Sequence, residues 1–214
     1  MVDAPAFASG PSSDPGFIHF DMLLRLVADL VALGAHHPGA ERIITVYTAT
    51  TRAREAPGVT RFTGERARQT NYATFDISLP PGRQPGKIDW PRNRPDPQRT
   101  VAVVDQHGLD EREFLARFSA SARSTQGEVS LFVHGYNQNF QQALFRLAQM
   151  VGDSQQETSS ILFAWPSQAT VAGYVADRDA VIYLRDYLVE MLAALARIAM
   201  FLKSPFSHIR WAAC

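Results

Sequence analysis

Three short apolar segments, with helical patterns between them, constrain this chain more than any other feature. Val129–Val133 and Ile161–Ala164 are almost entirely apolar, as strands are when both faces of a parallel sheet are covered. Between them, Asn139–Gly152 has apolar residues at helical spacing, and its closing glycine is the expected C-terminal stop. Asp179–Leu202 predicts a long helix before a third strand at His208–Ala212. This alternation predicts an α/β fold with a mostly parallel sheet and helices on both faces.

The first half of the chain adds three strand patterns and one helix. β-Branched and apolar residues dominate Arg42–Thr48, which predicts a strand that stops at the polar run Thr50–Arg52. Tyr72–Leu79 and Thr100–Asp105 are two further predicted strands. Asp110–Ala122 is predicted to be a helix with its aromatic residues facing inward. We assign these elements and the second half to one domain, residues 41–214.

Residues 1–40 are interpreted as a mobile tail plus an amphipathic helix. Residues 1–19 are rich in Pro, Gly, Ser and Ala, as mobile termini are. The apolar segment Asp21–Leu33 contains charged residues and no Lys or Arg precedes it, which is not the pattern of a secretory signal. No segment approaches the roughly 18 uninterrupted apolar residues of a membrane span. We therefore expect a cytoplasmic protein that does not enter a membrane.

The composition argues against several classes of partner. Lys plus Arg and Asp plus Glu each number 21, so the strongly basic balance of a nucleic-acid binder is absent. Cys214 is the only cysteine, and an intramolecular disulfide is impossible. The pair His36-His37 lies in a Gly/Pro context and is interpreted as a solvated loop. We expect no metal and no cofactor.

The most informative polar cluster, His134-Gly135-Tyr136-Asn137, directly follows a predicted strand. In open α/β sheets, ligands bind at the carboxyl ends of the strands. A glycine there lets the backbone turn sharply and expose N–H groups, and the following helix N-terminus favours negative charge. The cluster therefore fits a loop that stabilises an oxyanion. The alternative is an ordinary strand-to-helix turn with Asn137 or Asn139 as the N-cap.

Two more clusters follow the next strand. Trp165-Pro166-Ser167 comes directly after Ile161–Ala164, and Ser167 is a possible nucleophile. It lacks the glycines of a strained nucleophile elbow, however, so a cap or a loop hydrogen bond is the better interpretation, and Trp165 is expected to pack at the end of the sheet. For the third cluster the preferred interpretation is a local helix cap with an ion pair, and the alternative is that it supplies a catalytic acid. It consists of Tyr174, Asp177, Arg178 and Asp179.

Taken together, these motifs resemble a known family. LFVHGYN at 131–137, ILFAWPSQ at 161–168 and GYVADRDA at 173–180 occur in an order and spacing similar to a bacterial α/β-hydrolase family of unassigned function, often labelled esterase/lipase-like. RIITVYTATTR at 42–52, ISLPPGR at 77–83 and GKIDWP at 86–91 resemble the N-terminal half of the same family. The resemblance spans roughly residues 42–212 and implies a Ser–Asp–His hydrolase for acyl or carboxylic-ester hydrolysis.

The resemblance also implies positions for the functional residues. The nucleophile elbow of the family would begin on Ala212 and Ala213 and place the nucleophile on Cys214, the last residue. Since acid and histidine follow the nucleophile in this fold, we expect a domain that is incomplete, truncated before the elbow and inactive as this chain. A thiolate at Cys214 could still attack an ester. The candidate oxyanion and substrate-binding residues are His134, Gly135, Tyr136, Asn137, Trp165 and Ser167.

Two other interpretations remain open. One is a non-catalytic binding or interaction module, which would self-associate through an exposed sheet edge at His208–Ala212. The other is a truncated product without a function of its own. If the chain is active, its expected partner is a small, ester-like substrate.

Overall fold

The computed structural model describes residues 42–92, 94–135, 138–154, 156–167, 184–197 and 210–213. The tail and amphipathic helix predicted in residues 1–40 lie outside the described residues. The strands are β1 (Arg42–Arg54), β2 (Phe62–Leu79), β3 (Ala102–Leu109), β4 (Val129–Val133), β5 (Ser159–Ala164) and β6 (Arg210–Ala213), and the labelled helices are α2 (Glu111–Ser124) and α3 (Phe140–Ser154). Residues 184–197 are also helical.

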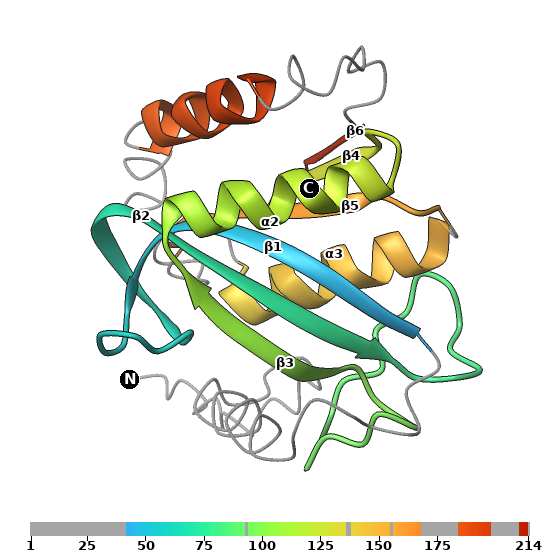
Figure 1. Ribbon diagram of the computed structural model, residues 1–214. Helices are drawn as coiled ribbons and strands as arrows, with labels where there is room; N and C mark the ends of the chain where they lie inside the picture. The colour runs from blue at the N-terminus through green and yellow to red at the C-terminus, as the bar shows by residue number, and fades with distance from the viewer. Residues whose placement is uncertain are drawn as a thin grey trace, which may run out of the picture.

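All the described strands form one sheet, in the order β3-β2-β1-β5-β4-β6 (Figure 1). β2 pairs in antiparallel fashion with β1 and β3. β5 pairs in parallel with β1 and β4, and β4 pairs in parallel with β6. The predicted α/β fold with a mostly parallel sheet is therefore confirmed, and β2 is the strand that makes the sheet mixed.

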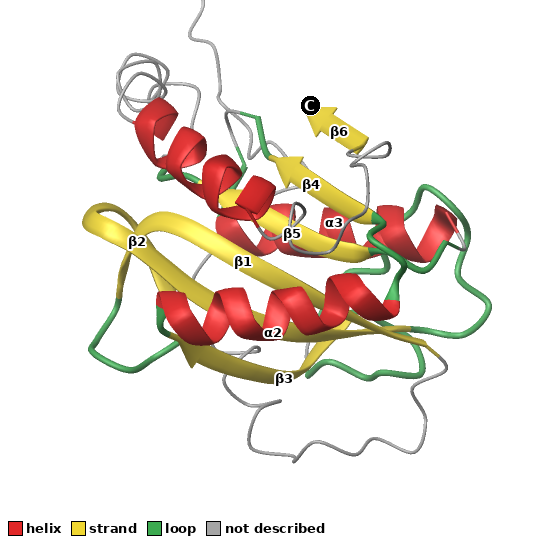
Figure 2. Ribbon diagram, turned by 45° about the horizontal axis from the view of Figure 1, so that its top comes forward, coloured by secondary structure: helices red, strands yellow, loops and turns green. Residues whose placement is uncertain are grey.

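Helices cover both faces of this sheet, and each face has its own apolar core. α2 lies in front of the sheet and α3 behind it in Figure 2. On the α3 face the core includes Val46, Phe75, Phe132, Leu144 and Leu162. On the α2 face, Phe114 and Phe118 of α2 join side chains of the helix 184–197, namely Leu184, Met191 and Leu195, against Phe163 and Trp165. Packing on both faces holds the sheet in place, and with it the ends of the strands.

The second strand is longer than its sequence pattern suggests. β2 begins at Phe62, whereas apolar alternation predicts a start at Tyr72. Its first half is polar, and it pairs with the end of β1 through register shifts on either side of Arg52. The buried Phe62 ring anchors this arm against Phe140, with 4.9 Å between the ring centroids. Such an arm depends on tertiary contacts that periodicity does not reveal.

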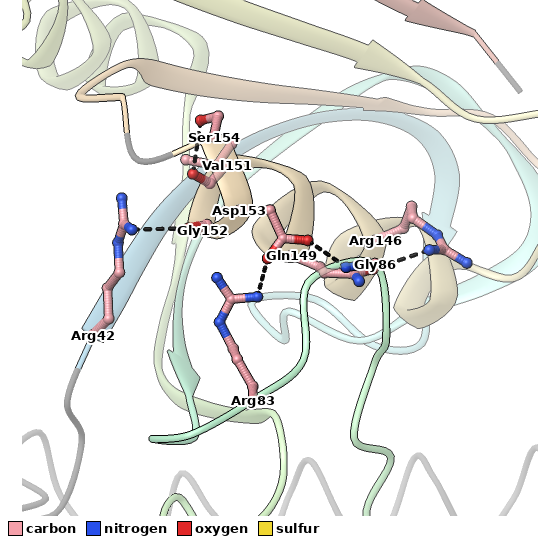
Figure 3. Close-up of polar contacts among 9 residues, drawn as sticks. All are labelled: Arg42, Arg83, Gly86, Arg146, Gln149, Val151, Gly152, Asp153 and Ser154. Atoms are coloured by element: carbon pink, nitrogen blue, oxygen red, sulfur yellow. Dashed lines mark hydrogen bonds and ion pairs between the residues drawn. The ribbon is translucent and has the colours of Figure 1, made fainter.

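The C-terminal end of α3 is held by a charged side chain of β1 and by residues of the loop after β2 (Figure 3). Arg42 donates to the carbonyl oxygen of Gly152 at 2.8 Å, which satisfies a carbonyl in the last turn of the helix. Arg83 pairs with the carboxylate of Asp153, and the Gly86 N–H donates to the same carboxylate at 2.8 Å. The helix continues to Ser154, so the prediction that Gly152 stops it is wrong. The glycine is required instead by the close approach of Leu79.

Replacing Asp153 with asparagine is expected to cost about 1 kcal/mol of unfolding free energy at pH 7, because two charge-assisted hydrogen bonds are weakened at a partly exposed site. Burial raises the pKa of Asp153, but the bonds from Gly86 and Arg83 and the charges of Arg83 and Arg42 outweigh it, and the pKa falls below 3.8. The folded pKa is thus below the unfolded one, so the stabilisation is complete above about pH 4 and is lost as the pH falls through the folded value.

Urea denaturation of wild type and Asp153→Asn between pH 7 and pH 3 measures this effect. The difference in unfolding free energy between the two proteins should become smaller below pH 4. Asp89→Asn is the control. The Asp89 carboxylate lies 3.6 Å from the exposed ammonium of Lys87, and an exposed ion pair of this kind contributes little to stability. A gap at Asp153 that is constant across the whole pH range would contradict the prediction.

Candidate functional site

Four parallel strands, β1, β5, β4 and β6, end along one edge of the sheet. Val133, the last residue of β4, pairs with Phe163 of β5 and with Ala213 of β6. The structure therefore brings together the residues that follow β4 and β5, which are His134 and Trp165. Gly135 and Ser167 are also described. The other candidates from the sequence lie outside the described residues, and these are Tyr136, Asn137, Tyr174, Asp177, Arg178, Asp179 and Cys214.

His134 and Trp165 lock the ends of their two strands together. The rings stack with 5.1 Å between centroids and 4° between planes. The Trp165 indole Nε1–H donates to the His134 carbonyl oxygen at 2.8 Å. The Trp165 backbone N–H donates to His134 Nε2 at 3.2 Å. Both side chains are buried, so this contact belongs to the framework of the site.

These bonds also determine how the His134 ring can act. Because Nε2 accepts a hydrogen bond, the proton of the neutral imidazole sits on Nδ1. Nδ1 lies 2.8 Å from the Gly135 carbonyl oxygen, so it donates there. A buried ring whose two nitrogens are both engaged holds the loop in place, and it is poorly placed to take a proton from a substrate.

Ser167 is part of a tight turn after β5. Its backbone N–H donates to the Trp165 carbonyl oxygen at 2.9 Å. The residue is 3% exposed, which leaves its hydroxyl little access to an incoming ester. The geometry thus favours a structural role for Ser167 over that of a nucleophile.

The helix after the His134 loop starts with a reciprocal cap. The Asn139 side chain accepts from the Gln142 N–H at 2.8 Å, and the Gln142 side chain accepts from the Asn139 N–H at 2.9 Å. Of the two N-caps that the sequence left open, the structure assigns Asn139. The start of α3 therefore lies at the carboxyl edge of the sheet, where its positive dipole end favours negative charge.

Arg52 is a site residue that the sequence reasoning missed, because its position after two threonines was interpreted as a polar stop. It lies near the end of β1 and is 1% exposed. Its guanidinium donates to the carbonyl oxygens of Thr63 at 3.2 Å, Gln138 at 3.3 Å and Ser167 at 3.4 Å. The only signal in the sequence is an arginine that directly extends a buried strand.

A cavity of about 590 Å³ lies beside this edge, between β2, the start of α2 and the helix 184–197. Its wall includes the rings of Tyr72, Phe114 and Tyr187 and the carboxylates of Glu111 and Glu190. Burial raises the pKa of the Tyr72 phenol, and the negative charges of Glu111 and Glu190 raise it further. The volume suits a small molecule. Sequence reasoning missed this cavity because its wall comes from four separate segments.

The described residues contain no helix long and apolar enough to cross a bilayer. They also contain no group of three His, Cys, Asp or Glu side chains close enough together to hold a metal ion.

Comparison with known families gives a match over residues 110–202, to the family described as alpha/beta hydrolase of unknown function (DUF900). The matched stretch includes α2, β4, α3, β5 and the helix 184–197, and with them both His134 and Trp165. Comparisons with curated proteins and with solved structures gave no match. Residues 110–202, which carry β4, β5 and the start of the His134 loop, are thus similar to this family of alpha/beta hydrolases of unknown function.

Proposed function

We propose that this protein has the acyl-transfer site of an esterase-type carboxylic-ester hydrolase at the carboxyl ends of β4 and β6, and that this chain is acylated there without turning the ester over. The observation that carries the proposal is the parallel pairing of these strands, with Ala213 opposite Val133. Val133 and Ala213 therefore lie side by side at the carboxyl edge of the sheet, and the proposal assigns the nucleophile to the position after Ala213. A nucleophile at that position and oxyanion donors in that loop are the two components that acyl transfer requires.

In this proposal the loop His134–Asn137 stabilises the charge that develops on the ester oxygen. Backbone N–H groups of the loop are the donors, and the N-terminal end of α3 adds a favourable potential. The nucleophile is residue 214, which is a cysteine in this chain. Its thiolate attacks the ester carbonyl carbon, a C–S bond forms, and the C–O bond to the alcohol breaks. The alcohol leaves as its anion and takes a proton from water, and a thioester remains on the protein.

The test is acylation of the purified chain by p-nitrophenyl acetate, followed by nitrophenolate release and by the mass of the C-terminal peptide. We expect one acetyl group on Cys214, formed at least about tenfold faster than on a synthetic peptide of residues 205–214, since one oxyanion donor can be worth 10²–10³ in rate. Cys214→Ala should abolish the acetylation.

Two results would contradict the proposal. Acylation of the folded protein at the rate of the peptide would mean that the loop does not assist the reaction. Ester turnover that is unchanged in Cys214→Ala would place the nucleophile elsewhere, and Ser167→Ala would then be the next variant.

A further inference from the structure

The guanidinium of Arg52 joins three segments that are distant in the sequence. Its acceptors are carbonyl oxygens of β2, of the residue before the α3 cap and of the turn after β5. A guanidinium is planar and offers five N–H donors in fixed directions. Carbonyls that share one such group are therefore fixed relative to each other, and in this case two of the three belong to the candidate site.

The bond to Gln138 orients the peptide unit at the end of the His134 loop. The carbonyl oxygen of Gln138 accepts from Arg52, and the N–H of the same planar unit, that of Asn139, donates to the Gln142 side chain. Because a peptide unit is planar, bonds at its two ends leave it little freedom to rotate. The loop therefore enters α3 in one orientation.

The bond to Ser167 acts on the other end of the loop through Trp165. Ser167 donates its backbone N–H to the Trp165 carbonyl, and the Trp165 indole holds the His134 carbonyl. The peptide unit that contains this carbonyl also carries the N–H of Gly135, which points the opposite way. Arg52 thus reaches the start of the loop through one turn and the end of the loop directly.

We propose that Arg52 is a positioning residue that fixes the peptide units at the two ends of this loop, His134–Gly135 and Gln138–Asn139, and so the direction of the Gly135 N–H. Its effect on acyl transfer rests on the proposed function, whereas its effect on the loop does not. Arg52 has no contact with substrate in this role.

Arg54, two residues further along β1, provides a matched control. Its guanidinium donates to Asn71 at 3.1 Å, to Val59 at 2.6 Å and to Tyr72 at 2.8 Å. All three acceptors lie in the β1–β2 hairpin or in β2, so loss of Arg54 removes three guanidinium hydrogen bonds away from the loops after β4 and β5, although Arg54 borders the cavity next to Tyr72.

The experiment is hydrogen exchange by mass spectrometry on wild type, R52K, R52M and R54M, read in peptides that cover residues 131–140, 163–168 and 55–72. We expect R52M to speed exchange by about tenfold in the first two peptides. R54M should speed exchange in the third peptide alone. R52K should give a smaller change than R52M, since an ammonium cannot satisfy three carbonyls with planar geometry. If R52M does not fold, the comparison of R52K with R54K decides.

The second readout is the rate of Cys214 acetylation. The rates are compared at urea concentrations chosen so that the proteins have equal unfolding free energies. We expect about a tenfold loss in R52K or R52M and no loss in R54M or R54K, because small misplacement of catalytic groups is costly in rate. Equal exchange in the loop peptides of the Arg52 and Arg54 variants would overturn the proposal. If wild type is acetylated no faster than the free peptide, the proposed function fails, and the exchange data still test Arg52.

Discussion

Trp165→Ala should lower the free energy of unfolding by about 3–5 kcal/mol, the usual cost of removing a large buried aromatic side chain. Trp165 is 3% exposed and packs in the core on the α2 face. The change also removes the stack on His134 and the indole bond to its carbonyl. Urea denaturation followed by circular dichroism measures the loss, since the variant removes a fluorescent reporter.

Trp165→Phe separates packing from hydrogen bonding. Phenylalanine keeps a ring that can stack on His134 but has no N–H for the buried carbonyl oxygen. An unsatisfied buried acceptor costs about 1–3 kcal/mol, so the unfolding free energy of this variant should lie between those of wild type and Trp165→Ala. If both variants were as stable as wild type, the lock between β4 and β5 would have no energetic importance.

The second large effect is expected at Gly152, at the opposite edge of the sheet. A Cβ added there would overlap Leu79 Cδ1 and lie 2.9 Å from Arg83 Nη2. Leu79 is 1% exposed, so its side chain cannot turn into solvent. We expect Gly152→Ala to cost about 1–3 kcal/mol through overpacking, even though alanine is favoured over glycine in a helix by about 1 kcal/mol.

Gly64→Ala is the matched control for this variant. Nothing lies within 4 Å of the added Cβ at Gly64, so the change in unfolding free energy should stay within about 0.5 kcal/mol. Thermal or urea denaturation of both variants gives the comparison. A Gly152→Ala protein that is as stable as wild type would show that the contact with Leu79 relaxes at no cost.

The central elements could be predicted from the sequence because their apolar residues follow simple periods. Buried strands such as β4 and β5 are short apolar runs, and the aromatic stripe of α2 repeats at helical spacing. Parallel pairing then places His134 and Trp165 at one edge. The stack between their rings and the proton position on His134 depend on side-chain geometry, which no linear pattern contains.

The parts that were not predicted depend on contacts between distant segments. Arg52 looks like a polar stop until the carbonyls of Gln138 and Ser167 are seen around it. Gly152 looks like a helix stop until Leu79 is seen against it. At both positions the residue type is explained by a contact with a residue distant in sequence, and not by local secondary-structure propensity.

The pairing of β1 with β5 has a consequence for how the chain folds. Thr50 donates to the carbonyl of Ala164, 114 residues further along the chain, whereas β2 pairs with β1, and β3 with β2, across shorter sequence separations. Closing a long loop delays a contact relative to local pairing. During synthesis the three-stranded meander can therefore form first, with one edge of β1 unprotected until β5 leaves the ribosome. That interval is when a chaperone, or aggregation through the open edge, would act on this protein.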